Sequence, residues 1–370
     1  MLRLAAEWTG RPRLSVLTVD HGLRAASAQE AAQVAAWAAQ AGLHHVTLNW
    51  TSAKPQSGIQ ARARAARYDL MSSWCRDHGA AVLLTAHTLE DQAETVLMRM
   101  ARTTSLDSLA GIPRFGHWHT TELFRPLLAE KRLELRAYLA SLDQTWIDDP
   151  SNEDDRFERV RIRKAMPVLA QLGITAEALA GLAGRATEAV RVLRGATDDW
   201  VKLYVRQFDT GHCIIPLSAF LDQTVAVQTR ILGGLISRYG SGKIPEPSEL
   251  ESMAAWAATG GNRRTLGGAI VARRKNHLLI GREPGRINPA AVPVPKSGVV
   301  LWDDRFEIHA EAGSSVIPVA YAGFLGRRRD IPSFVQQALP AIIQGGKSIF
   351  APHLAPASGC TAVFLSRLRR

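Results

Sequence analysis

Cysteine is scarce in this sequence, which holds only Cys75, Cys213 and Cys360. An odd number of widely separated cysteines argues against a disulfide framework and against CxxC metal or redox chemistry. Long hydrophobic runs are also absent: no stretch of about 18 apolar residues occurs, so we expect no segment to span a membrane. The opening residues, MLRLAAEWTG, have too short an apolar stretch for a secretory signal, and we expect a cytoplasmic protein.

Acidic residues are outnumbered by basic ones. The 370 residues carry 45 Lys and Arg against 34 Asp and Glu, a net charge of +11. A basic protein without a secretory signal often binds a polyanion, and nucleic acid is the leading candidate. The alternative is an arginine-rich composition without function. Clustering favours nucleic acid, because residues 327–370 hold seven basic residues against one acid and begin with Arg327, Arg328 and Arg329.

Common nucleotide and hydrolase motifs are missing as well. The sequence contains no GxGxxG, GxxxxGK[ST], HExxH or GxSxG. These absences leave no dinucleotide site, P-loop site, zincin site or nucleophile elbow to be recognised from a short motif.

The first 130 residues alternate between apolar runs and amphipathic segments. Such alternation predicts βαβ units and a doubly wound parallel sheet in an α/β fold. Ser27 and Glu30 are spaced as a capping box at the start of one helix. We expect strands at 13–19, 43–50, 80–86 and 122–128 and helices at 27–41, 58–79, 89–101 and 130–142.

The rest of the chain changes character twice. An acidic turn runs into a basic helix within 145–164, and residues 171–258 are mainly helical in pattern. Residues 263–283 read as two short strands around Arg273, Arg274 and Lys275, a basic hairpin. We therefore expect an α/β domain over 1–170, a helical domain over 171–258 and a small basic α+β region over 259–370.

The segment AHTLEDQAET places His87, Asp91 and Glu94 at spacings of four and three. On a helical wheel these side chains share one side, opposite Ala93, Val96, Leu97 and Met100, which we expect to pack on the sheet. Ligands of doubly wound sheets bind beyond the carboxyl ends of the strands, where this segment and VDHG at 19–22 both fall. Two carboxylates there suit a cationic or Mg²⁺-bound ligand. The alternatives are a solvated polar helix face and a metal hydrolase site.

Arginines recur at helical spacing elsewhere. Arg64 and Arg67 lie one turn apart, and Arg159 and Arg163 share a face of the basic helix. Helical arginines so spaced can hold phosphate or carboxylate in a bidentate manner, although an exposed cationic face is the commoner reason for such spacing.

The motifs VDHGLR, ARAARY, TAHTLEDQAETVLMRM, RPLL and IDDPSNEDDRFERVRIRKAMPVL, in this order, resemble the bacterial tRNA(Ile)-lysidine synthetases. These are ATP-dependent enzymes of the PP-loop, or N-type ATP pyrophosphatase, superfamily. The likeness is close over residues 1 to about 170 and looser beyond. It implies that ATP and Mg²⁺ are used, that free L-lysine is joined to the wobble cytidine of the CAU-anticodon isoleucine tRNA, and that AMP and pyrophosphate are released.

The resemblance also implies site residues. His87, Asp91 and Glu94 match the stretch that holds activated base and lysine, and Arg159 and Arg163 match the helix approaching the reaction centre. Asp20, His21, Arg64 and Arg67 match the nucleotide side. The basic hairpin Arg273, Arg274 and Lys275 and the run Arg327, Arg328 and Arg329 are expected to contact tRNA. Val160 replaces a usual Asn, and RTTSLDS at 102–108 replaces glycines.

One family motif, SGGxDS on a first and central strand, does not occur in these residues. Its place would be just before residue 1. We expect a translation start assigned too late, or a fragment, and for a chain that begins here weak ATP-dependent activity and poor solubility. The remaining alternatives are a catalytically impaired tRNA-binding fragment and another PP-loop tRNA-modifying enzyme such as a thiolase, although a thiolase usually needs paired cysteines.

Overall fold

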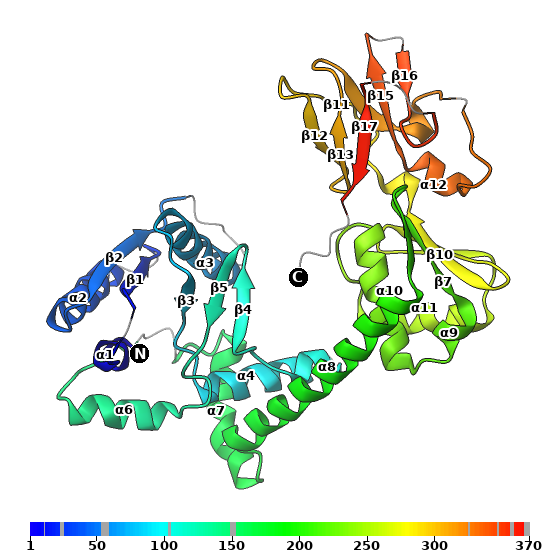
Figure 1. The fold of residues 1–370 in the computed structure, drawn as a ribbon. Coiled ribbons are helices and arrows are strands. Elements are labelled where there is room, and N and C mark those ends of the chain that lie inside the picture. The colour runs from blue at the N-terminus through cyan, green and yellow to red at the C-terminus, as the bar shows by residue number, and fades with distance from the viewer. Residues whose placement is uncertain are drawn as a thin grey trace. The chain divides into compact units, whose positions relative to one another are not determined.

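The protein forms two compact units, Met1–Val190 and Arg191–Arg370 (Figure 1). The domain boundaries that we expected near residues 170 and 258 stay predictions. The computed structural model describes residues 1–10, 12–22, 26–52, 59–102, 105–148, 153–324, 326–345, 348–355 and 359–365.

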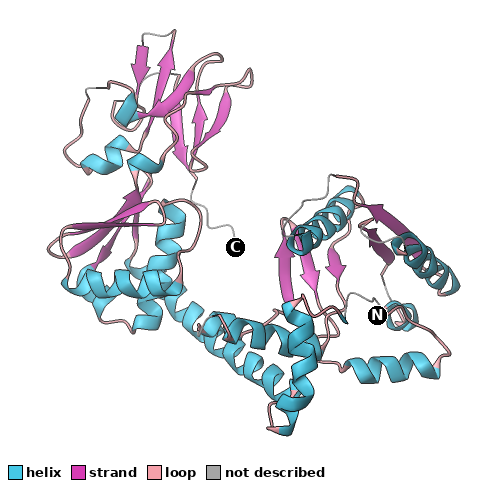
Figure 2. Cartoon of the chain, turned by 180° about the vertical axis from the view of Figure 1, so that it is seen from behind, coloured by secondary structure: helices cyan, strands magenta, loops and turns pink. Residues whose placement is uncertain are grey.

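The strands of the first unit lie in two groups (Figure 2). Strand β1 (Ser15–Asp20) pairs in parallel with β2 (His44–Asn49), in register from Ser15 opposite His44 to Asp20 opposite Asn49. Strand β3 (Val82–Leu84) pairs in parallel with β5 (Thr121–Phe124), and β4 (Phe115–Trp118) is antiparallel to β5. Parallel pairing is therefore confirmed for β1 with β2 and for β3 with β5, whereas the antiparallel strand β4 was not predicted. The unit has mixed α/β content.

The helices of this unit follow the predicted order. The expected capping box of Ser27 and Glu30 is wrong: Ala26 is the N-cap, and the Ser27 hydroxyl instead donates to Asp20 Oδ1 at 2.6 Å. The helices are α1 (Leu2–Glu7), α2 (Ser27–Gln40), α3 (Ile59–Asp77), α4 (Leu89–Met100), α5 (Leu106–Leu109), α6 (Arg132–Ser141), α7 (Glu158–Gln171) and α8 (Ala176–Tyr204).

Helix α3 supplies the largest apolar cluster of the first unit. Tyr68, Met71 and Cys75 project from it at helical spacing and pack against Leu83 of β3 and Leu123 of β5. Burial of large apolar side chains contributes about 1.5–3 kcal/mol each. This cluster fixes the sheet on which the candidate site is built.

The apolar face of α4 packs differently from the prediction. Ala93 and Val96, both 0% exposed, meet Leu179 and Ala183 of α8 and not the sheet. Met100 remains 47% exposed. Helix α4 therefore connects the carboxyl end of β3 to a helical layer.

The second unit contains a five-stranded sheet in the order β6–β7–β10–β9–β8. The predicted basic hairpin is confirmed, since β9 and β10 flank Arg274 and Lys275, and β8 adds a third strand that the prediction had merged with β9. The strands are β6 (Arg206–Phe208), β7 (His212–Pro216), β8 (Arg263–Leu266), β9 (Ala269–Arg273) and β10 (His277–Arg282); the helices are α9 (Leu217–Leu221), α10 (Val225–Tyr239), α11 (Pro247–Thr259) and α12 (Ser333–Gln337).

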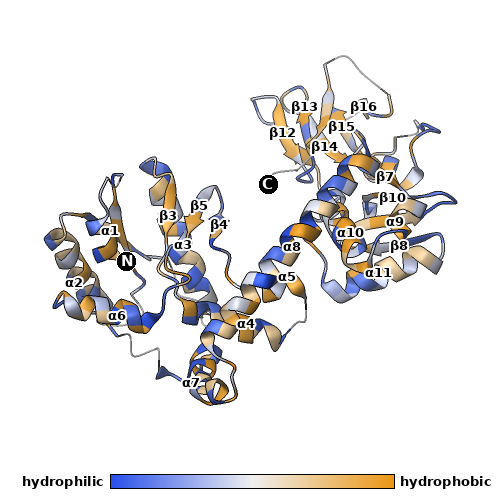
Figure 3. Cartoon of the chain, turned by 60° about the horizontal axis from the view of Figure 1, so that its bottom comes forward, coloured by the Kyte–Doolittle hydropathy of each residue, from blue (hydrophilic) through white to orange (hydrophobic). Residues whose placement is uncertain are grey.

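Two smaller sheets complete the unit, in the orders β11–β14–β15–β16 and β12–β13–β17. Their strands are mainly hydrophobic in Figure 3, where β14 and β15 carry the buried Val316 and Ile342. Asp303 lies between two buried arginines, 3.1 Å from Arg282 and 2.6 Å from Arg305. The strands are β11 (Val292–Pro293), β12 (Val299–Trp302), β13 (Phe306–His309), β14 (Ser315–Pro318), β15 (Pro340–Gln344), β16 (Ser348–Phe350) and β17 (Thr361–Phe364).

Two sequence expectations about composition can be compared with the fold. Cys75, Cys213 and Cys360 are free and buried, as expected. Within the described ranges no single helix is long and apolar enough to span a bilayer, and α7 with α8 meets that test only as a pair across a bend of 100°.

Candidate functional site

His87 follows strand β3 and precedes helix α4. The helix begins at Leu89 with Thr88 as N-cap, which confirms the predicted helix start, so His87 lies in the connecting loop and does not share the helical wheel with Asp91 and Glu94. The side chain is buried, with Nδ1 3.0 Å from Thr85 Oγ1. Burial lowers the pKa of His87 to about 4. His87 is therefore a neutral imidazole at pH 7.

Asp91 is the third residue of α4 and completes a capping box with the N-cap Thr88. Its Oδ2 accepts hydrogen bonds from the Thr88 amide at 2.8 Å and the Thr88 hydroxyl at 3.1 Å. Its Oδ1 lies 3.7 Å from Arg132 Nη2, and 17% of the side chain is exposed. The negative charge of Asp91 favours the protonated imidazole and so partly offsets the lowering of the His87 pKa. The carboxylate is therefore close enough to interact with that ring. One carboxylate oxygen is thus committed to the helix, and the other faces the Arg132 guanidinium.

Glu94 does not face an open crevice, and this part of the prediction is wrong. The side chain is 1% exposed, and Oε1 accepts from Arg163 Nε at 2.8 Å. Arg159 Nε lies 3.0 Å from Oε2, and its Nη2 donates to Thr95 Oγ1 at 3.1 Å. A carboxylate already paired with two guanidiniums has little charge left for an ammonium group. The metal hydrolase alternative loses its third ligand for the same reason.

Arginines surround the neutral histidine. Arg64 and Arg67, both exposed on α3, lie over the Tyr68 ring at 5.2 and 5.5 Å from its centre. Arg125, at the end of β5, is 6% exposed, and its Nη1 donates to the Pro113 carbonyl at 2.7 Å. Arg125, Arg64 and Arg67 all favour the neutral form of His87 and so lower its pKa. This cationic side of the site suits phosphate or carboxylate groups.

Asp20 and His21 end strand β1, the first strand of the other group. Asp20 Oδ1 accepts from the Gly22 amide at 2.8 Å and from the Ser27 hydroxyl at 2.6 Å. The carboxylate therefore closes the turn that leads toward helix α2. His21 is half-buried beside it.

The predicted tRNA-contacting residues lie in the second unit, and they differ in how far their side chains are held by neighbouring residues. Arg273 donates to the carbonyls of Gly260 and Ala258, each at 3.2 Å, at the end of α11. Arg328 forms a bidentate pair with Asp330. Arg274, Lys275, Arg327 and Arg329 are exposed. The exposed four remain open to a polyanion, whereas Arg273 and Arg328 first of all order the local backbone.

Gln92 is a site residue that sequence reasoning missed. Its Oε1 accepts from the Ile112 amide at 2.6 Å, and its Nε2 donates to the Ile112 carbonyl at 3.2 Å. Gly111, with φ of +63°, passes so close that a Cβ there would lie 2.7 Å from Gln92 Oε1. Arg125 and Arg132 were missed as well. No pattern in the sequence joins these distant positions, because only the fold brings them to α4.

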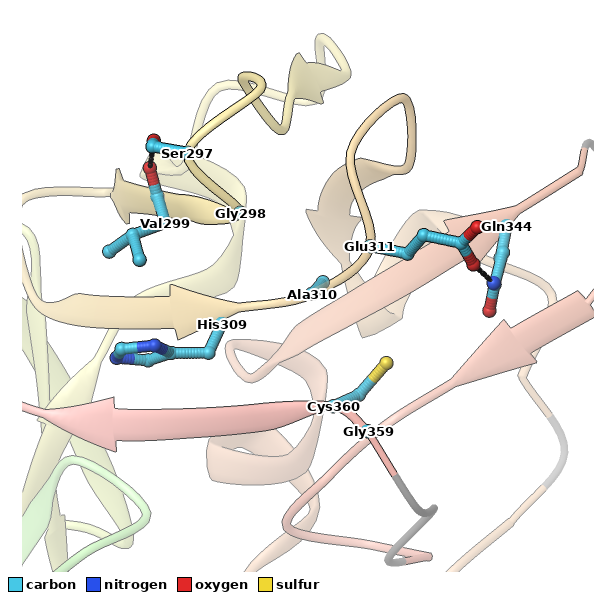
Figure 4. Close-up of a pocket in the computed structure, with 9 residues that line it drawn as sticks. All are labelled: Ser297, Gly298, Val299, His309, Ala310, Glu311, Gln344, Gly359 and Cys360. Carbon is cyan, nitrogen blue, oxygen red and sulfur yellow. Dashed lines mark hydrogen bonds between the residues drawn. The ribbon is translucent and has the colours of Figure 1, made fainter.

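Within the described ranges no group of three His, Cys, Asp or Glu side chains is arranged to hold a metal ion. An open cavity of about 410 Å³ occurs in the second unit (Figure 4), where Glu311 and Gln344 contact each other. None of the predicted site residues lines it. Its lining residues are Ser297, Gly298, Val299, His309, Ala310, Glu311, Gln344, Gly359 and Cys360.

Comparison with known proteins agrees with the order of motifs. Residues 1–169 match the model of the PP-loop domain family. A tRNA(Ile)-lysidine synthase of Rhodopseudomonas palustris is 38% identical over 303 residues, covering 77% of this chain and 87% of the relative. That of Ruegeria pomeroyi is 32% identical over 363 residues, covering 95% and 84%. A solved U34-tRNA thiolase of Methanococcus maripaludis aligns over 50% of this chain and 66% of its own, with 14% identity and a TM-score of 0.43.

Proposed function

The chain belongs to the tRNA(Ile)-lysidine synthase family of PP-loop enzymes, and from that premise we propose that it joins free L-lysine to the wobble cytidine of the CAU-anticodon isoleucine tRNA. The observation that carries the proposal is the 38% identity over 303 residues, which includes the His87–Glu94 segment. As in the family, ATP first adenylates O2 of the base with release of pyrophosphate. The lysine Nζ then forms a bond to C2, the C2–O2 bond breaks, and AMP leaves.

Asp91 is the carboxylate that we assign to the lysine ammonium group. Its side chain is 17% exposed, and Oδ1 is free of the helix cap with one arginine, Arg132, at 3.7 Å, whereas Glu94 is 1% exposed and paired with two arginines at 3.0 and 2.8 Å. His87, with a pKa of about 4, takes up almost no proton at pH 7 and acts here as a neutral hydrogen-bonding group beside Asp91.

Arg159 and Arg163 are assigned to the approach of the tRNA or nucleotide phosphates, held in position by Glu94. Both arginine side chains keep about a third of their area in solvent, 35% and 30%, and we assign this exposed part to contact with an anionic ligand. Arg64 and Arg67 on α3 are assigned to the nucleotide side, since they are exposed and close to His87. In this arrangement cations bind the anionic substrates and Asp91 binds the one cationic substrate.

The Mg²⁺ expected with ATP has no ready-made protein site in the described ranges. Mg²⁺ commonly binds phosphates and only one or two carboxylates, so a dedicated cluster is unnecessary. Asp20, at the carboxyl end of β1, is the carboxylate that we assign to this side.

The finer fold prediction is part of the same proposal. In the described structure β1 pairs with β2, and β3 pairs with β5. We assign both groups to one doubly wound sheet, with the family's SGGxDS strand belonging between β1 and β3. We further propose a cytoplasmic enzyme, with tRNA contacts from the helical segment 171–258 and from exposed cations of 259–370.

Transfer of labelled lysine to an isoleucine tRNA transcript tests the function. Because residues 1–370 contain no SGGxDS motif, the protein is assayed as it is and with a designed strand and SGGxDS loop placed ahead of Met1. We expect ATP-dependent incorporation that requires cytidine at the wobble position. Asp91→Asn, which can keep the helix cap, should lower kcat/KM for lysine by about 10- to 100-fold. Glu134→Gln, an exposed control on α6, should not.

Failure of both forms to transfer lysine would contradict the proposed function. So would transfer that does not depend on the wobble base. Normal kcat/KM for lysine in Asp91→Asn, with active wild-type protein, would contradict only the role of Asp91.

A further inference from the structure

We propose that Phe115 is a stacking platform for an unpaired base of the tRNA anticodon loop, next to the base that is modified. The inference rests on the proposed function, because it takes tRNA as the partner. It adds a contact that neither the motifs nor the cationic residues of the site supply.

Phe115 is exposed to a degree that its surroundings do not explain. The side chain is 69% exposed at the start of β4. One face of its ring stacks on Phe124, with centroids 4.7 Å apart and planes at 14°. The Arg114 guanidinium lies 5.5 Å from the centre of the Phe124 ring. An aromatic pair with an adjacent guanidinium and an open ring face has the composition that stacks unpaired RNA bases.

The platform lies at the same strand end as the candidate site, on the opposite face of the strand. Phe115 pairs with Phe124 in the β4–β5 ladder, at the carboxyl end of β5. The Phe124 carbonyl accepts from the Thr85 amide at 3.0 Å, and Thr85 contacts His87. Consecutive residues of a strand point to opposite faces, so Phe124 and Arg125 present the platform and the His87 site on two sides of one strand end. A neighbouring base, and not the reacting base, is therefore the ligand of Phe115.

The segment that carries the platform is held in place before any RNA binds. Gln92 of α4 exchanges two hydrogen bonds with the Ile112 backbone. Arg125 donates to the Pro113 carbonyl, and its amide donates to the Arg114 carbonyl at 3.0 Å. A platform fixed from both α4 and β5 loses little freedom on binding, which favours affinity.

An RNA base fits this surface better than an apolar protein segment does. The chain carries a net charge of +11, and Arg114 is itself exposed beside the ring, so a phosphate next to the stacked base meets a cation. Phe124, on which the ring stacks, is partly buried, so the exposed Phe115 ring is the outer layer of the pair. One ring face is the area that a single stacked base needs.

The test uses the full chain, transcripts with 2-aminopurine placed in the anticodon loop one position at a time, and four proteins. Phe115→Leu keeps an apolar side chain and removes the π face, and Phe115→Trp keeps the π face. His117→Ala is the matched control, because His117 is exposed on the same strand two residues along. We expect Phe115→Leu to weaken tRNA binding by about 5- to 100-fold and to abolish the quenching of one loop position. Phe115→Trp and His117→Ala should keep both.

The outcomes separate this inference from the proposed function. Wild-type protein that binds the isoleucine transcript no better than an unrelated tRNA contradicts the proposed function. Specific binding by wild type, with Phe115→Leu equal to it in affinity and quenching, overturns only the stacking platform. Loss of self-association in Phe115→Leu without loss of tRNA affinity would also overturn it, and would assign the ring to a contact between copies.

Discussion

Replacing Glu94 by glutamine tests whether one buried carboxylate holds helix α7 against helix α4. Glu94 is 1% exposed, with Arg159 and Arg163 nitrogens at 3.0 and 2.8 Å. Glutamine keeps the shape of the side chain and removes its charge. Two guanidiniums are then left facing a buried neutral amide, so their mutual repulsion is no longer offset.

The magnitude follows from how deeply the three groups are buried. Removing one partner of a buried ion pair costs about 3–5 kcal/mol, because the remaining charge stays desolvated. Here the arginines keep 35% and 30% of their side-chain area in solvent, and hydration recovers part of the loss. We expect about 2–3 kcal/mol, and a Tm of the unit Met1–Val190 lowered by about 4–12 °C.

Differential scanning calorimetry of the variant and the wild type measures this shift. Glu177→Gln is the matched control, because it removes an exposed ion pair with Lys131 at 2.8 Å, and exposed pairs add little stability. Its Tm should stay at the wild-type value. Equal melting of Glu94→Gln and Glu177→Gln would refute the reasoning, since Glu94 would then contribute no more than a surface carboxylate.

Three further predictions follow from the described contacts. His87 and His212 each have a pKa of about 4 through burial, below the unfolded value of about 6.5, so their stabilisation is complete above about pH 6.5 and is lost as pH falls toward 4. A urea midpoint that does not fall between pH 7 and 5 would contradict this. Gly111→Ala introduces a Cβ at φ +63° and 2.7 Å from Gln92 Oε1, which should lower the free energy of unfolding by at least about 1–2 kcal/mol. Hydrogen exchange of the Ile112 amide should become faster. An unchanged exchange rate would show that the Gln92 contact is not needed to protect this amide. Arg274→Ala combined with Lys275→Ala should weaken tRNA binding and reduce the slope of log affinity against log salt by roughly two; an unchanged slope would exclude the hairpin from the interface.

Local chemistry in the sequence determined the elements and the family. The short β-branched runs before Asp20 and His87 predict strands because their signal lies within a few residues, and β1 and β3 confirm them. The basic hairpin is confirmed for the same reason. Family membership could be predicted because five motifs in order are far more specific than any one, and the relatives confirm it.

Only the tertiary structure decided the surroundings of the site residues. Glu94 and Arg163 are 69 positions apart, and no local pattern shows that the carboxylate of one is buried against the guanidinium of the other. The apolar face of α4 is legible in the sequence, but its partner, Leu179 of α8 and not the sheet, depends on how the chain returns. The periodicity of apolar residues predicts which side of a helix is buried. It does not predict which element covers that side, because the covering element comes from a distant segment of the chain. The sequence therefore treats Asp91 and Glu94 as equals, whereas in the fold Glu94 is 1% exposed and Asp91 is 17% exposed.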